Sequence, residues 1–269
     1  MIRIFSILAG LAFSFVLGLS FIFEAINTAK DGLPTSAEKQ FHEHPGALAL
    51  KSDGVLGTFD NAQLQRGLAV YQGVCQSCHS LSYVAFRDLK ALGYDDDEVK
   101  AIAKAYQVPA YNSGTGEAKA HPGLPTDHFP PVVYGGKGNP PDLSLITKAR
   151  HGGAAYVHSL IMGYAAQPAE LVAKFPDAKT PEGLYYNPYF ANLNIAMPPP
   201  LTADGQVTYS DGTKATKDQM AKDVSAFLVW TAEPKLDKRK QTGWPVVLFL
   251  IFATGLAWMA KKQIWADQH

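Results

Sequence analysis

Two long apolar runs, one near each end of the chain, enclose a central region of mixed polarity. The first run, residues 4–23, follows an arginine and ends close to small residues, a pattern typical of a secretory signal peptide. Its length also approaches the roughly 20 residues that span a bilayer. The pattern therefore predicts that residues 1–29 form either a cleaved signal peptide or an N-terminal membrane anchor.

The second apolar run, residues 243–260, contains no charged side chain and has basic residues on both flanks. Tryptophans stand near its two ends, where membrane interfaces favour them. A buried core helix is the alternative, but the basic flanks on both sides argue against it. We expect a transmembrane helix over residues 243–260 and a short tail over residues 261–269.

Helical spacing marks both the start and the end of the central region. Asp60 stands where a helix N-cap is expected, Gln63 is placed to complete a capping box, and apolar residues follow on one face. A later helix from Thr216 carries a similar apolar stripe. We expect residues 30–237 to form one folded domain.

Three further patterns predict the local structure between these helices. The acidic residues 95–98 suit a helix N-terminus and are interpreted either as a solvated cap or as a docking patch for a basic partner. Residues 109–143, rich in proline and glycine, predict a long loop with little regular structure. The Asp-Gly pair within residues 207–213 predicts a small hairpin.

The first predicted helix runs into the pattern Cys-x-x-Cys-His, whose fixed members are Cys75, Cys78 and His79. This pattern is typical of covalent c-type haem attachment. Two thiols about one helical turn apart can add to the two vinyl groups of a haem, while the histidine binds the iron. A redox dithiol or half of a zinc site is the alternative, but zinc would need further Cys or His at ligand spacing, and none is visible.

Composition excludes some other classes of function. With 47% hydrophobic and 18% charged residues, the chain has the composition of a folded protein. Its 24 basic residues balance 24 acidic ones, which removes a broad electrostatic case for binding nucleic acid. The two cysteines both belong to the haem motif, so no disulfide is available.

The second axial ligand of the iron decides the chemistry, because an open position binds small ligands and a thioether supports electron transfer at a raised potential. Met197 stands in an irregular segment before three prolines, which fix the backbone and lower the entropy cost of holding a flexible side chain. Met220 falls in an apolar helical stripe, Met259 in the predicted span, and Met162 at a helix end. We therefore predict Met197 as the ligand.

The haem carboxylates need charged or hydrogen-bonding partners if they are buried. Arg150, beside a Gly-Gly turn, is the best basic candidate, although an ordinary surface arginine is the alternative. Tyr71 and Tyr156 are candidates for pocket walls or propionate donors, and ordinary aromatic packing is the alternative for both.

Six segments, in order along the chain, carry a resemblance to a known family: 65–79, 140–144, 149–153, 185–188, 197–200 and 230–234. Together they resemble the cytochrome c1 family, the haem subunit of ubiquinol–cytochrome c reductase. The resemblance runs from about Phe59 to the C-terminal anchor. The haem motif alone is shared by every c-type cytochrome, but the ordered set is specific to this family.

The resemblance implies a mainly α, class I cytochrome c-like haem domain with long loops and a C-terminal transmembrane helix. It implies thioether links at Cys75 and Cys78, axial ligands at His79 and Met197, and a propionate partner at Arg150. Two tyrosines and one proline match further haem-binding positions: Tyr71, Tyr156 and Pro141. Some bacterial relatives carry an additional cysteine pair, and this chain has none.

The resemblance also implies partners and a location. The subunit would accept an electron from the Rieske iron–sulfur protein and pass it to a soluble or membrane-tethered cytochrome c. Cytochrome b would be its neighbour in the bilayer, within a dimeric complex, and the subunit would not be catalytic alone. Because c-type attachment occurs on the outer side, we expect a periplasmic haem domain on a bacterial inner membrane, with residues 261–269 cytoplasmic.

Two alternative functions remain distinguishable by experiment. A membrane-anchored cytochrome c that serves an oxidase directly would not form a stable complex with cytochrome b and the Rieske protein. A ligand-binding haem sensor would keep its sixth coordination position open, so its reduced spectrum would shift with carbon monoxide.

Overall fold

The computed structural model describes residues 2–31, 35–111, 118–136 and 138–267. The chain divides into two compact units, Met1–His42 with Pro168–Lys179 and Glu43–Gln167 with Thr180–His269. The elements of the first unit are α1 (Ile2–Asp31), α2 (Ala37–Phe41), α7 (Ala169–Lys174) and the short 3₁₀ helix η3 (Pro176–Ala178). In this unit, the rings of Phe41 and Phe175 meet edge-on at 6.4 Å between centroids.

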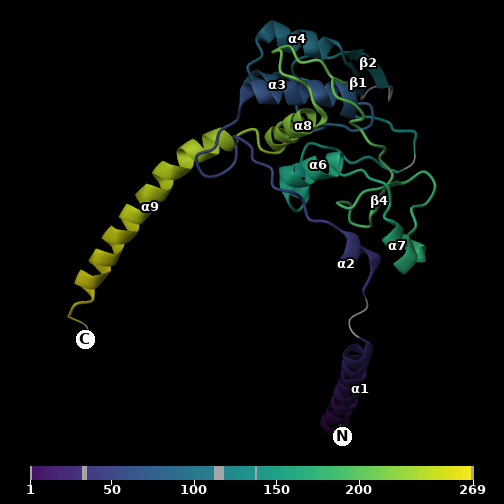
Figure 1. The fold of residues 1–269 in the computed structure, drawn as a ribbon. Coiled ribbons are helices and arrows are strands. Elements are labelled where there is room, and N and C mark those ends of the chain that lie inside the picture. The colour runs from purple at the N-terminus through teal and green to yellow at the C-terminus, as the bar shows by residue number, and fades with distance from the viewer. Residues whose placement is uncertain (1, 32–34, 112–117, 137, 268–269) are drawn as a thin grey trace. The chain divides into compact units, whose positions relative to one another are not determined.

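The second unit contains the remaining elements and the hydrophobic core (Figure 1). Its helices are α3 (Asn61–Val70), η1 (Tyr71–Cys75), η2 (Phe86–Leu92), α4 (Asp96–Lys104), α5 (Ile146–Ala149), α6 (Gly153–Met162), α8 (Lys217–Ala232) and α9 (Leu236–Ile264). Its strands are β1 (Gln107–Tyr111), β2 (Ala118–Pro122), β3 (Tyr185–Tyr186) and β4 (Asn194–Ile195). The prediction of a mainly helical fold is confirmed.

Helix α3 begins where the sequence predicts, with the Asp60 carboxylate accepting the Gln63 backbone N–H at 3.3 Å. The reciprocal half of the capping box is absent, because the Gln63 amide donates instead to Asp223 on α8, at 3.2 Å. After Val70 the helix widens into the π turn η1, in which the Gln76 N–H donates to the Tyr71 carbonyl at 2.9 Å. This turn delivers Cys75 at its last residue, and π turns are frequent at functional sites.

Helices α3 and α8 pack directly against each other in the core. Gly67 makes their approach possible, since a Cβ there would lie 2.2 Å from the backbone oxygen of Asp223 and 2.5 Å from Cβ of Phe227. The predicted apolar stripe of α8 is buried, including Met220, which is a core residue as expected.

A buried ion pair joins the same two helices. Asp223 on α8 is fully buried and accepts from Arg66 on α3, with Nε to Oδ2 at 2.9 Å. The amides of Gln63 and Gln219 also donate to its carboxylate. Arg66 reaches a second carboxylate on Asp211, at 2.7 Å. Each charge therefore has a partner, as buried charges require.

Two local predictions differ from the structure in part. The segment predicted as a long loop with little regular structure, residues 109–143, is irregular from residue 123 onward but contains most of the antiparallel pair β1–β2, with Val108 opposite His121. Residues 112–117 and 137 lie outside the described part of the chain. The hairpin predicted over residues 207–213 does not form strands. Its Asp-Gly turn does form, closed by the Thr213 N–H donating to the Asp211 carboxylate at 2.9 Å.

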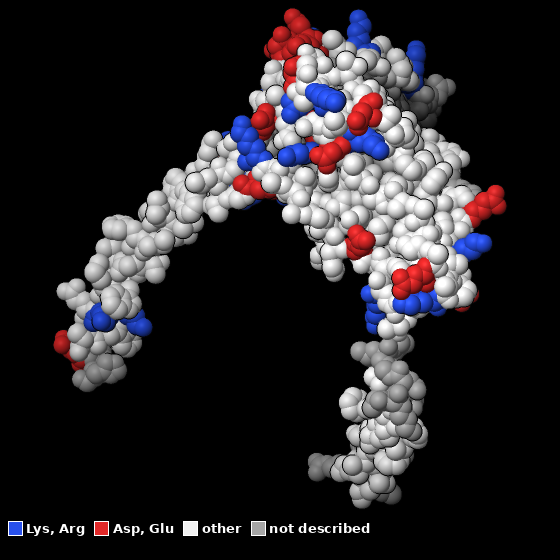
Figure 2. Space-filling view, in the orientation of Figure 1, with Lys and Arg blue, Asp and Glu red and all other residues white. Residues whose placement is uncertain are grey.

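The acidic cluster of residues 95–98 lies at the start of α4, and red side chains gather over this helix in Figure 2. Asp95 and Glu98 form a reciprocal capping box. Asp96 pairs with Lys90, and Asp97 pairs with Lys100 at 2.9 Å. The helix-cap interpretation is thus supported by four contacts, which also reduce the charge left for a partner.

Helix α9 includes the predicted span 243–260 and extends it at both ends. It is one of two described helices long and apolar enough to cross a membrane, and the other stretch, Ile4–Ile26 within α1, lies near the N-terminus. The most apolar window of each helix is unburied. Asp237 in the first turn of α9 accepts from the Phe59 N–H at 3.2 Å, and Lys240 donates to the carbonyls of Ser52 and Gly57. These contacts hold the start of α9 against residues 52–59, the segment that precedes α3.

Candidate haem site

A cavity of about 660 Å³ opens beside the Cys-x-x-Cys-His motif in the second unit. Its volume lies in the range of roughly 300–1,000 Å³ that is typical of cofactor sites. The site residues predicted from the sequence line it with one exception: Cys75, Cys78, His79, Pro141, Arg150, Tyr156 and Met197. The exception is Tyr71. Residues separated by more than 100 positions in the sequence thus line the same cavity.

The two cysteines lie on a single turn of backbone. The N–H groups of Cys78 and His79 both donate to the Cys75 carbonyl, at 3.1 and 2.9 Å. Burial, with Cys78 as a smaller cause, raises the pKa of Cys75 to about 12. A redox dithiol requires a lowered thiol pKa, so the environment of Cys75 argues against that alternative. The described residues also contain no cluster of three or more potential metal-binding His, Cys, Asp or Glu side chains, as a zinc site would need.

His79 is oriented by one hydrogen bond to the backbone. Its Nδ1 lies 2.8 Å from the carbonyl oxygen of Pro141. Because a carbonyl can only accept, Nδ1 carries the proton and Nε2 is left with a free lone pair for a metal. Burial lowers the pKa of His79 and outweighs the opposing effects of Pro141 and Asp142, which favours the neutral ring that metal binding needs.

The segment that supplies Pro141 is tied to the residues after the motif. The Asp142 carboxylate accepts the N–H groups of Ser82 and Ser144, both at 2.8 Å, and the Leu143 N–H donates to the Ser80 carbonyl at 2.9 Å. Burial raises the pKa of Asp142, but these hydrogen bonds outweigh it and the pKa is lowered. The anionic carboxylate therefore fixes the Pro141 carbonyl relative to His79.

Met197 lies two residues after strand β4 and is partly buried at the cavity wall. The hydroxyl of Tyr164 donates to its carbonyl at 3.0 Å. The other described methionines do not line the cavity. Met220 is buried in the core, Met162 is exposed at the end of α6, and Met259 lies exposed on α9. Met197 is therefore the methionine placed to reach a cofactor bound here.

Arg150 and Tyr156 lie together on the cavity wall. Arg150 is exposed and donates from Nη1 to the carbonyl of Ala149, at 3.0 Å. Burial raises the pKa of the Tyr156 hydroxyl despite the opposing charge and hydrogen bond of Arg150. A guanidinium and a protonated phenol thus lie side by side, both able to donate to a carboxylate.

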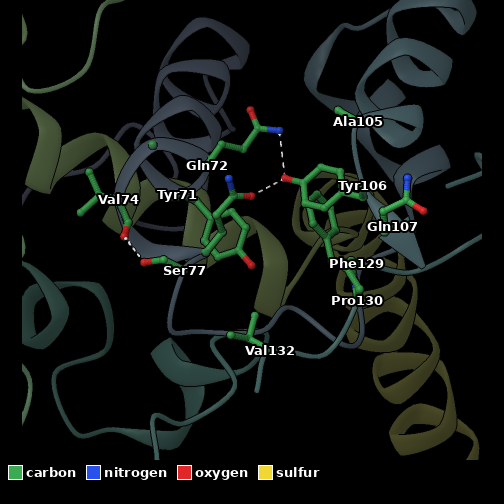
Figure 3. Close-up of a pocket in the computed structure, with 12 residues that line it drawn as sticks. Tyr71, Gln72, Val74, Ser77, Ala105, Tyr106, Gln107, Phe129, Pro130 and Val132 are labelled. Atoms are coloured by element: carbon green, nitrogen blue, oxygen red, sulfur yellow. Dashed lines mark hydrogen bonds between the residues drawn. The ribbon is translucent and has the colours of Figure 1, made fainter. Parts of the chain in front are cut away.

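Tyr71 lies against the backbone of the motif, next to the larger cavity. Its hydroxyl donates to the His79 carbonyl at 2.9 Å, and its ring packs edge-on against Phe129 at 5.9 Å. Tyr71 lines a neighbouring cavity of about 500 Å³, shown in Figure 3, which shares Gly73, Val74 and Ser77 with the larger one. There the Tyr106 hydroxyl accepts from Gln72 and donates to Gln76. Tyr71 therefore supports the histidine residue rather than the wall of the larger cavity.

Sequence reasoning missed several residues of the site. Tyr164 was not singled out because its contact with Met197 depends on two loops that meet only in the fold. The cavity wall also includes residues with no motif around them: Tyr134, Phe190 and Gln206. The role of the Pro141 carbonyl is likewise invisible in the sequence, since every residue carries a carbonyl.

The residues present fit a haem. Two thiols one turn apart, a histidine whose Nε2 lone pair is available, a methionine, and a guanidinium beside a phenol are the kinds of side chain that hold a covalent haem. A mainly helical unit with this cavity and a membrane-length C-terminal helix defines a membrane-anchored c-type cytochrome.

Comparison with known proteins makes the identification specific. The Cytochrome C1 family matches residues 50–268, so the chain belongs to the cytochrome c1 family, as the resemblance indicated. Cytochrome c1 of Rhodospirillum rubrum is 44% identical over 231 residues, covering 80% of this chain and 85% of the relative. The mitochondrial cytochrome c1 heme protein of Saccharomyces cerevisiae is 40% identical over 251 residues, covering 90% and 76%.

A third relative has a name that combines cytochrome b with cytochrome c1. A protein called cytochrome b/c1 from Bradyrhizobium diazoefficiens is 44% identical over 239 residues. The match covers 80% of this chain and 35% of the relative, which is therefore much longer. Family membership implies a covalent haem c, for which Cys75 and Cys78 are present.

Proposed function

We propose that this chain is the electron-transfer subunit of a cytochrome bc1 complex, accepting an electron from the Rieske iron–sulfur protein and passing it to a soluble or membrane-tethered cytochrome c. One observation carries the proposal: His79 and Met197 line the same cavity beside the attachment motif. If both side chains bind the iron, it would have no open position, which suits electron transfer and disfavours ligand sensing.

Each residue of the site has a role in this proposal. Cys75 and Cys78 would hold the haem covalently, and His79 through Nε2 and Met197 through its thioether would bind its iron. When bound, the haem supplies a one-electron Fe(III)/Fe(II) couple whose potential the thioether raises. The Pro141 carbonyl keeps the His79 proton on Nδ1.

Two donors that line the cavity, Arg150 and Tyr156, are proposed as partners of the haem carboxylates. They would donate hydrogen bonds to these carboxylates and so offset the cost of burying their charge. Tyr71 restrains the backbone of the proposed ligand His79, because its hydroxyl donates a hydrogen bond to the His79 carbonyl.

The proposed partners follow from the family and from the names of relatives. The relative called cytochrome b/c1 supports cytochrome b as the neighbour in the membrane, since its name joins the two proteins in one chain. The dimeric complex, the Rieske protein and the cytochrome c acceptor come from the family resemblance. The subunit is not an enzyme alone, because ubiquinol oxidation requires the other subunits.

The proposed arrangement places a haem domain, residues 30–237, on the periplasmic side of a bacterial inner membrane. The apolar helices indicate a membrane protein, and the outer side is proposed because c-type attachment occurs there. Residues 243–260 span the bilayer and residues 261–269 form a cytoplasmic tail, of which 268–269 lie outside the described part of the chain. Residues 1–29 are a signal peptide or a second anchor.

Purification of the tagged full-length chain from its native membranes tests this proposal. We expect cytochrome b and an iron–sulfur protein to co-purify with it, and ubiquinol to reduce its haem in a reaction that needs both partners. The control is a chain carrying His79→Ala. Ubiquinol should reduce the haem of this variant more slowly than that of the wild type. Purification of the haem-loaded chain with an oxidase and without cytochrome b would contradict the proposal and favour the oxidase-linked alternative.

A further inference from the structure

The hydroxyl of Tyr164 donates to the carbonyl of Met197 at 3.0 Å. Tyr164 is partly buried and follows directly on Gly163, the C-cap of helix α6. Four residues of α6 line the large cavity: Tyr156, Val157, Leu160 and Ile161. The hydrogen bond therefore links the end of a cavity-lining helix to the residue proposed as the sixth ligand.

The end of α6 also contacts the segment that precedes the Met197 loop, which is the irregular stretch after β4 that carries Met197. The amide of Asn187, which is fully buried, donates to the Leu160 carbonyl at 2.8 Å, and the Asn187 N–H donates to the Leu193 carbonyl at 2.8 Å. Gly163 has no side chain, and a Cβ there would lie only 2.3 Å from a ring carbon of Tyr189. This close packing fixes the position of Tyr164 relative to the turn that leads into β4.

The Met197 loop needs such support because its own structure is slight. The sheet before it consists of β3 and β4, which have two residues each. Beyond it, Gln206 donates to the Pro200 carbonyl at 2.8 Å. Methionine has three rotatable bonds, so holding its sulfur in one place depends on a fixed backbone. The hydrogen bond from Tyr164 to the Met197 carbonyl restrains the backbone at Met197 itself.

We propose that Tyr164 is a positioning residue for the sixth iron ligand, whose hydroxyl holds Met197 at the cavity wall. The inference rests on the proposed function, because it requires Met197 to bind the iron. Loss of the hydroxyl shifts the equilibrium from bound toward detached methionine, and the detached form has an open iron position.

The test compares Tyr164→Phe with Tyr185→Phe in the haem-loaded full-length chain, kept in its native membranes. Both changes remove one hydroxyl and keep the ring. Tyr185 is a matched control because it is 41% exposed and its ring lies 6.5 Å from that of Tyr164. We expect Tyr164→Phe to raise the fraction of reduced haem that binds carbon monoxide by about fivefold, the effect of one lost hydrogen bond. Its midpoint potential should fall, and Tyr185→Phe should match the wild type in both measurements.

Two further measurements separate the possible failures. The unfolding temperature of each variant shows whether a change is general, and a lower temperature with unchanged carbon monoxide binding and potential would overturn the role of Tyr164. Met197→Leu, measured alongside, tests the ligand itself. If Met197→Leu opens the iron to carbon monoxide and Tyr164→Phe does not, the positioning role fails while the proposed function stands. If Met197→Leu has no effect either, the ligand assignment and the inference fail together.

Discussion

Gly67→Ala is expected to destabilise the haem domain by about 3 kcal/mol, although alanine is the better helix former. On an exposed helix the change would stabilise by about 1 kcal/mol. In this protein the new Cβ would lie 2.2 Å from the Asp223 backbone oxygen and 2.5 Å from Cβ of Phe227. Neither contact can relax by a side-chain rotation, so α3 and α8 must move apart. Overpacking therefore outweighs helix propensity.

Denaturant unfolding of the purified haem-loaded chain, followed by its visible absorption, measures this effect. Gly46→Ala is the matched control, because a Cβ there would meet only Ser159 Oγ at 3.8 Å, an ordinary contact. We expect the control to unfold within about 0.5 kcal/mol of the wild type, as is usual for surface changes. A Gly67→Ala chain as stable as the control would show that α3 and α8 do not cross as closely as described.

Asp223→Ala is expected to cost about 3–5 kcal/mol, because it leaves a half-buried arginine without its principal partner. Arg66 would retain only the exposed carboxylate of Asp211, and the amides of Gln63 and Gln219 would lose their shared acceptor. The double change Arg66→Met with Asp223→Leu removes both charges and fills the space with apolar groups. Such replacements are often close to neutral, so we expect the double variant to regain most of the lost stability.

A double-mutant cycle made of Arg66→Met, Asp223→Leu and their combination, read by the same unfolding assay, measures the coupling of the two residues. The account requires the double variant to be clearly more stable than Asp223→Ala alone. Equal losses in the two variants would mean that Asp223 acts through local helix structure and not through its charge pair with Arg66.

Much of the site could be predicted from the sequence because its chemistry is local or rare. The spacing of Cys75, Cys78 and His79 is fixed by the haem itself, and Met197 was distinguished by three prolines and by the helical settings of the other methionines. Helix α3 was predicted from Asp60, and α9 from its apolar length. These signals lie within a few residues of the feature that they predict.

The remaining features depend on contacts between distant segments. The sequence predicts Tyr71 as a wall of the haem pocket or a propionate donor, whereas its hydroxyl donates to the His79 carbonyl and its ring lines the neighbouring cavity. The Asp211 turn was predicted to close a hairpin, but its carboxylate is engaged by Arg66 and its flanking segments find no strand partner. Tyr164 gains its contact with Met197 only because α6 and the β3–β4 turn are packed together. A pattern of neighbouring residues does not predict contacts between segments that lie far apart in the sequence.

The central claim, one-electron transfer at an iron with two protein ligands, is tested most directly by the reduced absorption spectrum with and without carbon monoxide. The samples are the native haem-loaded chain and Met197→Leu. We expect a native spectrum that carbon monoxide does not change, and a variant that binds carbon monoxide and has a lower midpoint potential. A native protein that already binds carbon monoxide would have an open iron position, and both the Met197 assignment and the electron-carrier function would be contradicted.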